Sequence, residues 1–135
     1  MILLGIDYVT FSGGMAFLGP TTILPTLVRL LGGSAIVVGS LGTIMSGGWL
    51  LPQLFAGRYV ANRPLVKKYI LVPACLSRAC LALLVPTLMW LAGRAPALAL
   101  SVLLLAYLGF MVGDALASVG WLELLGKTVA IERRG

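Results

Sequence analysis

Residues 95–122 read APALALSVLLLAYLGFMVGDALASVGWL, and Asp114 is the one charged residue in this run. A helix that crosses about 30 Å of hydrocarbon needs roughly 20 mostly apolar residues. Three similar runs precede it, at 8–28, 30–57 and 69–93, and Arg78 is the one charged residue in those three. The sequence therefore predicts an all-α, polytopic membrane protein with four transmembrane helices.

The composition supports membrane insertion. Hydrophobic residues make up 60% of the 135-residue chain and charged residues 10%, and the mean hydropathy is +1.07. Soluble domains carry about 25% charged residues. The net charge of +6 does not indicate nucleic-acid binding, because the basic residues lie at the ends of the apolar runs. We expect the lipid bilayer, and no nucleic acid, as the main partner.

The distribution of Lys and Arg orients the chain. The second break and the C-terminal tail are basic, whereas the first and third breaks each contain one arginine, Arg29 and Arg94. Short cytoplasmic loops are rich in Lys and Arg, which predicts an up-down-up-down arrangement with both termini in the cytoplasm. We expect a multi-pass protein of the cell membrane. The residues behind this orientation are Arg58, Arg63, Lys67, Lys68, Lys127, Arg133 and Arg134.

Glycine, serine and proline residues in the breaks indicate where the helices end and begin. We expect helices at about 7–31, 34–59, 66–92 and 96–125, forming a single transmembrane domain over 1–135. Gly32 and Gly33 make a tight turn, and Ser34 is suited to cap the next helix. In the third break, Gly93 ends one helix and Pro96 begins the next.

The first expected helix is interrupted at 19–22, which read Gly-Pro-Thr-Thr, and again at Pro25. Proline removes a backbone hydrogen bond, and the freed carbonyl groups need a partner or a wet cavity. Discontinuous helices are common at transporter binding sites, although such a kink can also serve packing alone. Threonine hydroxyls in turn can bond to their own helix. The candidates for cavity-lining residues are Asp7, Thr21, Thr22 and Pro25.

Two rows of small residues predict close helix contacts. One row consists of Gly39, Thr43 and Gly47, and the other of Gly109, Gly113 and Ala117. Such rows let helix backbones approach each other in lipid. We expect the second and fourth helices to make close packing contacts through these rows.

Arg78 and Asp114 are predicted at similar depth, about 12–14 Å from the cytoplasmic ends of consecutive antiparallel helices. An ionised group at that depth normally faces the interior and finds a partner. We therefore expect an intramembrane ion pair between them. Asp114 could carry a proton for coupling, or Arg78 could bind an anionic substrate. A static salt bridge that fixes helix register is the alternative.

Residues suited to enzymatic chemistry are missing from the sequence. It contains no histidine, and Cys75 and Cys80 are five residues apart within one helix, which is a poor spacing for a disulfide or a shared metal. We expect no enzyme activity, no metal and no cofactor.

Short motifs along the chain resemble the major facilitator superfamily. A Leu-Pro at 24–25 is followed by the glycine turn at 31–34 and by Gly39, the second break is basic, and the chain closes with Glu-Arg-Arg-Gly at 132–135. The second break departs from the superfamily pattern, because Asn62 stands where an acidic residue is usual. The arginine often found in helix four is also missing. The resemblance implies a cytoplasmic gate in which Arg63 pairs with Glu123. The gate residues are Arg58, Arg63, Lys67, Lys68 and Glu123.

The resemblance also implies a function. Members of this superfamily have twelve helices and move solutes by alternating access, so the chain is similar to their N-terminal third. We expect a secondary transporter, or an N-terminal part of one, for a small solute and with possible proton coupling. It would need the missing helices or self-association. The alternatives are a homodimeric four-helix exporter, which usually has a glutamate in helix one that is absent here, and a non-transporting membrane subunit.

Overall fold

The structure, a computed structural model, is all-α over the residues that it describes, which confirms the predicted class. It describes residues 6, 9, 12–13, 15–16, 18–19, 21, 23–61 and 67–128. Three of its helices contain segments that are long and apolar enough to cross a membrane, which indicates an integral membrane protein. The helices are α2 (Ile23–Leu30), α3 (Ala35–Ala61), α4 (Lys67–Leu91) and α5 (Pro96–Thr128).

The segment before α2 contains a break where the sequence predicts one. Residues 6, 9, 12–13, 15–16 and 18 are helical, Gly19 lies in a bend and Thr21 in a turn. Helix α2 then begins at Ile23 and has 8 residues, too few to cross about 30 Å of hydrocarbon. A membrane-spanning helix over the whole of 7–31 therefore stays a prediction.

A glycine turn joins α2 to α3. Gly32 has a φ of 82°, a left-handed conformation that glycine adopts without steric cost. Its N–H donates to the carbonyl of Arg29, and the N–H of Gly33 donates to the carbonyl of Val28, a pairing that satisfies the last carbonyls of α2. Ser34 then accepts a hydrogen bond of 3.4 Å from the N–H of Val37. The predicted turn and helix cap are both confirmed.

The connection between α4 and α5 also follows the sequence. Helix α4 ends at Leu91, and Pro96 is the first residue of α5, where its missing N–H costs no helical bond. The N–H groups of Arg94 and Ala95 both donate to the carbonyl of Leu91. The connection between α3 and α4, which includes Arg63, lies outside the described residues.

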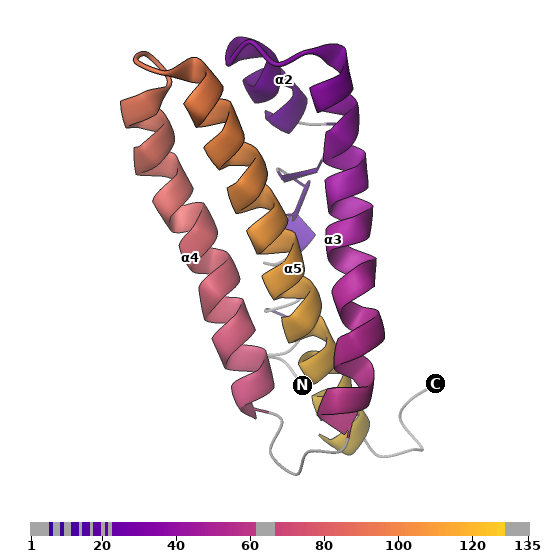
Figure 1. The fold of residues 1–135 in the computed structure, drawn as a ribbon. Coiled ribbons are helices and arrows are strands. Elements are labelled where there is room, and N and C mark those ends of the chain that lie inside the picture. Colours follow the sequence, from indigo (N-terminus) through magenta and orange to yellow (C-terminus); the bar gives the residue numbers. More distant parts are fainter. Residues whose placement is uncertain are drawn as a thin grey trace.

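Helix α5 is the centre of the bundle, with α4 on one side and α3 on the other (Figure 1). Its contacts with α4 are the most extensive, those with α3 are next, and α2 packs on α3. Helices α3, α4 and α5 alternate in direction, so α3 and α5 run parallel to each other. The main neighbour of α3 is thus α5, and not the next helix in the sequence.

The row of small residues on α5 permits the predicted close approach, and the neighbouring helix is α4. A Cβ atom at Gly113 would lie 2.9 Å from the Cβ of Ser77 and 3.1 Å from the carbonyl oxygen of Pro73. A Cβ at Gly109 would lie 3.3 Å from the sulfur of Cys80. The contacts at Gly113 leave no room for a side chain, whereas the contact at Gly109 is tight but involves a side-chain atom. Gly113 therefore sets how closely α4 and α5 pack.

The expected role of the α3 row is wrong for the described part of the chain. A Cβ built at Gly39 or Gly47 would meet no described atom within 4 Å, and Thr43 is exposed. The contact with α5 is instead made at Gly48, whose added Cβ would lie 2.9 Å from the Cβ of Met111. The α3 row therefore lies on the open side of the helix.

A proline in α4 contributes to a second close contact with α5. Pro73 lies inside the helix and has no N–H to donate to the carbonyl of Tyr69, four residues earlier. A Cβ at Gly120 of α5 would lie 3.2 Å from that carbonyl oxygen. Glycine lets the α5 backbone lie beside a carbonyl group that the helix itself leaves without a donor.

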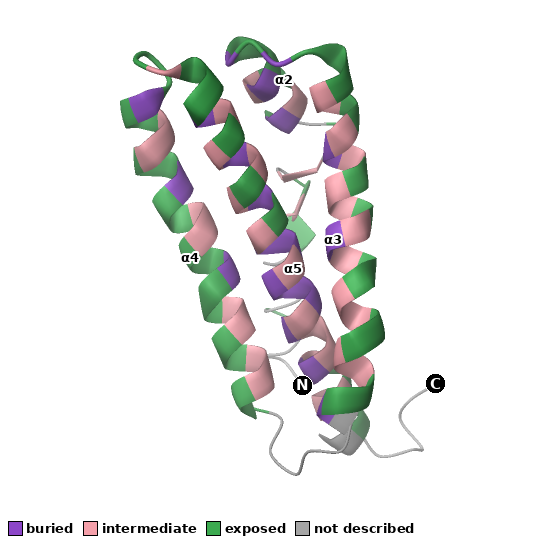
Figure 2. Ribbon diagram, in the orientation of Figure 1, coloured by how far each residue is buried: buried purple, intermediate pink, exposed green. Residues whose placement is uncertain are grey.

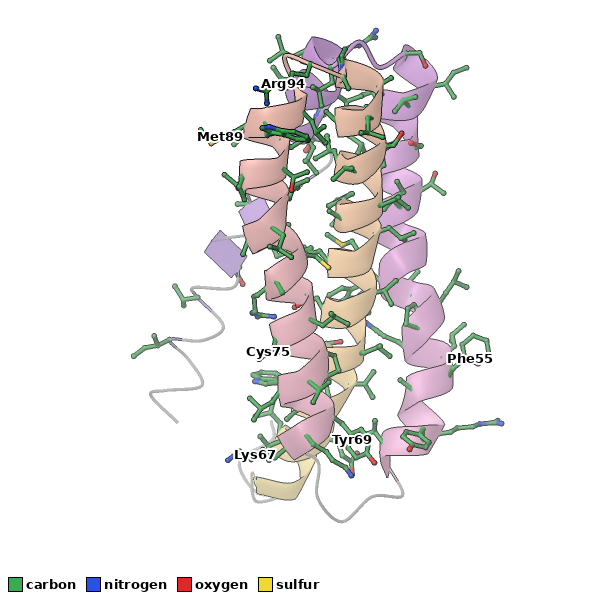
Figure 3. All side chains as sticks on the ribbon, turned by 60° about the vertical axis from the view of Figure 1, so that its left-hand side comes forward. Phe55, Lys67, Tyr69, Cys75, Met89 and Arg94 are labelled. Atoms are coloured by element: carbon green, nitrogen blue, oxygen red, sulfur yellow. The ribbon has the colours of Figure 1, made fainter. Side chains whose placement is uncertain are left out.

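The core lies along one side of α5 and under α2. Leu103, Tyr107 and Phe110 are spaced by four and three residues, so they lie on one helix face, and all three belong to a buried cluster that also contains Leu24 and Val28 of α2. Purple bands on α5 in Figure 2 show that burial concentrates on this helix. The outer sides of α3 and α4 expose large apolar side chains, such as Phe55 and Met89 (Figure 3). Lipid or further helices can cover such surfaces.

Candidate functional site

An ion pair joins the two most closely packed helices. Nη1 of Arg78 on α4 lies 3.1 Å from Oδ1 of Asp114 on α5. Each residue directly follows a residue of the close contact, since Ser77 precedes Arg78 and Gly113 precedes Asp114. The structure thus brings together the two charges that the sequence pairs by depth, and a role in coupling stays a prediction.

A small hydrogen-bond network surrounds the pair. Nη1 of Arg78 also donates to Oγ of Ser77 at 3.1 Å and, at 3.4 Å, to the carbonyl of Ala74. The Ser77 hydroxyl donates in turn to the Ala74 carbonyl at 2.9 Å. Ser77, which is fully buried, therefore links the guanidinium group to the backbone of α4. These contacts fix the position of Nη1 beside the carboxylate.

The two charged side chains differ strongly in exposure. The carboxylate side chain of Asp114 is 6% exposed, whereas the side chain of Arg78 is 53% exposed. Removing either partner would have unequal effects, because an unpaired buried charge costs several kcal/mol whereas a half-exposed one keeps some access to other partners. The carboxylate of the pair is therefore buried, whereas the guanidinium group is about half-exposed.

Both residues lie far from the helix ends. At 1.5 Å per residue, Arg78 is about 16 Å from the start of α4 and about 20 Å from its end. Asp114 is about 21 Å from the end of α5 by the same rise. In a membrane, this places the pair near mid-depth, where ionisable residues are usually functional.

A buried tyrosine, Tyr107, lies on the same face of α5 as Asp114, and the sequence alone did not identify it as a candidate. Tyr107 precedes Asp114 by two helical turns and is 1% exposed. Its hydroxyl has no hydrogen-bond partner among the residues that the structure describes. A buried hydroxyl without a partner is unusual. Its seven-residue spacing from Asp114 could have identified it as a residue of the same face.

An open hollow of about 580 Å³ lies between the first segment, α3 and α5. Sequence reasoning also missed it, because its apolar lining is spread over three segments. Three of its residues are methionines, which adapt to ligands of irregular shape. The lining residues are Ser12, Met15, Met45, Ser46, Trp49, Leu50 and Met111.

The predicted cavity-lining residues do not belong to this hollow where they are described. Thr21 is exposed in a turn, and Pro25 is half-buried within α2. Neither residue lines the hollow. Asp7 and Thr22 lie outside the described residues, so a cavity-lining role for these two residues stays a prediction.

The predicted gate residues gather at one end of the bundle where they are described. Arg58 lies in the last turn of α3, Lys67 and Lys68 begin α4, and Glu123 lies near the end of α5. The three basic side chains are exposed and Glu123 is half-buried. Figure 3 shows Lys67 at the opposite end of α4 from Arg94. Pairing of Glu123 with Arg63 stays a prediction, because Arg63 lies outside the described residues.

Metal-binding clusters are absent from the described residues, where no three His, Cys, Asp or Glu side chains gather. Cys75 and Cys80 are both free thiols. The chemistry that this part of the chain offers is therefore that of the Arg78–Asp114 pair and the apolar hollow. Comparisons with protein families, with curated proteins and with solved structures found no match for this chain.

Proposed function

We propose that this chain is an integral membrane secondary transporter of the major facilitator type, or an N-terminal part of one, and that it moves a small solute by alternating access. The observation that carries this proposal is the Arg78–Asp114 ion pair, 3.1 Å long, between two helices that can cross a membrane. A charge pair near mid-depth is costly to insert and is typical of solute and proton pathways.

Two further features support transport. The first segment is interrupted at Gly19 and Thr21, as are discontinuous helices that border transporter sites. The apolar hollow of about 580 Å³ has the size of sites that hold small molecules. The short sequence motifs add the superfamily resemblance.

The proposal includes an orientation. The end of the bundle with Arg58, Lys67 and Lys68 is cytoplasmic and the end with Arg29 and Arg94 is external, because cytoplasmic ends carry more Lys and Arg. The first segment then forms a fourth span, and both termini lie in the cytoplasm of a cell-membrane protein. A complete transport pathway needs further helices or a second copy.

Uptake into proteoliposomes tests the function. The protein, expressed in its natural reading frame, is reconstituted and given a panel of radiolabelled organic anions, cations and neutral solutes under an imposed pH gradient. We expect saturable uptake of at least one solute, its loss in Asp114→Asn and its retention in the control Arg94→Gln. Uptake no faster than in protein-free liposomes for every solute would refute transport.

The cytoplasmic gate has its own test. If Arg63 pairs with Glu123 in the closed gate, reversing either charge should reduce uptake, and reversing both should restore it. Charge reversal keeps a pair of opposite charges, so side-chain size alone cannot explain rescue. Failure of the double variant to recover, with normal amounts of protein in the membrane, counts against this gate.

One observation favours the second candidate, a membrane subunit that associates without transporting. Gly39 and Gly47 on α3 have no described atom close to where a side chain would begin, and such open glycine rows are typical of helix–helix interfaces in membranes. Solute uptake, measured together with the size of the purified protein in detergent, distinguishes the candidates: a stable complex without uptake supports the subunit, and uptake supports the transporter.

A further inference from the structure

The guanidinium group of Arg78 makes all its observed contacts through one nitrogen. Nη1 donates to Asp114, to Ser77 and to Ala74. An arginine side chain carries five N–H groups in a planar fork. The N–H of Nε and the two of Nη2 have no acceptor among the residues that the structure describes. One edge of the fork is therefore open.

The open edge cannot be left against hydrocarbon. Arg78 is about 16 Å from the nearer end of α4, and a charged side chain at such depth costs at least about 2.5–3.5 kcal/mol unless it finds a partner. The exposed fraction of 53% shows that the ion pair covers only part of the group. An acceptor from outside the described bundle is thus needed to complete its hydrogen bonds.

The surface around Arg78 gives such an acceptor room to approach. Residues three and four positions away are the neighbours of a helical residue on its own face. Three of these four positions hold small side chains, Ala74, Cys75 and Ala82, of which the last two are exposed. The fourth position holds Leu81, which is half-buried. Large side chains would shield the guanidinium group here, whereas the three small ones do not. Access is therefore built into the helix surface.

We propose that the open edge of Arg78 binds a singly charged oxyanion, a carboxylate or a phosphodiester, through two parallel hydrogen bonds. A planar guanidinium fork matches two oxygens of one anionic group. Each negative charge on a bound ligand has to be buried at mid-depth, so a monoanion costs less desolvation free energy there than a dianion. The site consequently selects monoanions. If the proposed transport function holds, this site assigns organic monoanions as the class of substrate, and this part of the inference rests on that proposal.

Nitrogen-15 NMR of the arginine side chains tests the binding directly. The whole chain, labelled on arginine, is placed in nanodiscs of neutral phosphatidylcholine and titrated with benzoate, with benzamide as the uncharged probe of the same shape. We expect a saturable shift of the Arg78 Nε resonance with benzoate and none with benzamide. The resonance is assigned by its loss in Arg78→Lys. A second series contains phosphatidylglycerol, whose headgroup is a phosphodiester.

Three variants separate binding from folding. Arg78→Lys keeps the positive charge but loses the fork, and we expect at least tenfold weaker benzoate binding, measured by tryptophan fluorescence. Arg78→Gln/Asp114→Asn leaves the summed charge of the two residues unchanged but removes the guanidinium group, and it should not bind. Arg94→Gln is the matched control and should bind like the wild type.

The outcomes are distinct. A benzoate shift in neutral discs supports a solute carboxylate, and a shift only with phosphatidylglycerol supports the same site occupied by a lipid headgroup. An Arg78 resonance that responds to neither, or Arg78→Lys that binds benzoate as tightly as the wild type, overturns the inference. Benzoate binding without uptake of any solute would leave this site standing and remove the transport proposal.

Discussion

Gly113 provides a sharp test of the close contact between α4 and α5. In Gly113→Ala, the new methyl group would lie 2.9 Å from the Cβ of Ser77, 3.1 Å from the Pro73 oxygen and 3.3 Å from the Ser77 nitrogen. Two of these three atoms belong to the backbone, so a change of side-chain rotamer cannot relieve the contact. The helices must separate or bend.

The magnitude follows from two opposing effects. Overpacking in a well-packed contact costs about 1–3 kcal/mol, and alanine in place of glycine within a helix gains about 0.5–1 kcal/mol. We therefore expect Gly113→Ala to lower the free energy of unfolding by about 1–2 kcal/mol. The matched control is Gly39→Ala on α3, where the added methyl group meets no described atom within 4 Å. That variant should be neutral or slightly more stable.

Reversible unfolding in mixed detergent micelles, followed by circular dichroism, measures both variants under identical conditions. The expected result is an ordering, with Gly39→Ala at or above the wild type and Gly113→Ala clearly below it. Equal stabilities for the two variants would refute the argument, because they would show that Gly113 is not where the helices meet. Destabilisation by Gly39→Ala alone would refute the placement of α3.

The remaining predictions concern the charges. In a double-mutant cycle, Arg78→Gln should destabilise more than Asp114→Asn, because it removes the guanidinium group from beside a buried carboxylate, at a cost of up to about 3–5 kcal/mol. The double variant should recover much of the loss, and additive effects of the two changes would show that the pair is not coupled. For the orientation, single cysteines replacing Lys67 and Ser34 in a chain without other cysteines should react with an impermeant maleimide only from the cytoplasm and only from outside, respectively. Labelling of both from the same side would exclude it.

Helix ends could be predicted closely because single residues determine them. The expected ranges 34–59, 66–92 and 96–125 compare with Ala35–Ala61, Lys67–Leu91 and Pro96–Thr128 in the structure. Ser34 and Pro96 favour a helix start through contacts and backbone angles within a few residues of the chain, so their effect can be predicted without knowing the tertiary structure. Counting residues predicts a depth of about 12–14 Å for both Arg78 and Asp114, which is less than the depths of about 16 Å and about 21 Å that the observed start of α4 and end of α5 give. The contact between them follows from the cost of an isolated charge.

The neighbours of each helix could not be predicted in the same way. Helix α3 is apolar on all sides, and a helix without a polar face gives no periodicity that shows which side meets another helix. The row at Gly39 and Gly47 thus predicts a close contact that the described residues do not show, and the observed contact at Gly48 lies one residue away from that row. One residue along a helix is a rotation of about 100°, enough to turn a contact into an open surface.

The burial of Tyr107 and the hollow beside Met111 depend on the same missing information. Both residues lie on α5, whose middle portion is covered on more than one side. A sequence run of apolar residues does not distinguish a central helix from a peripheral one. Such functional candidates become visible only when the packing partners are known.

The packing of α4 on α5 and the ion pair form one structural unit. Gly113 brings the α5 backbone against Ser77, and the next residue on each helix supplies one of the two charges. A separation of the helices by even about 1 Å would stretch the 3.1 Å distance between Nη1 and Oδ1 beyond good hydrogen-bond geometry. Gly113 thus keeps the two charged side chains close enough to pair. Their attraction in turn favours the close helix contact that a residue with a side chain would prevent. Gly113→Ala should consequently weaken the coupling energy between Arg78 and Asp114 as well as the fold, whereas a purely structural contact would change stability and leave that coupling intact.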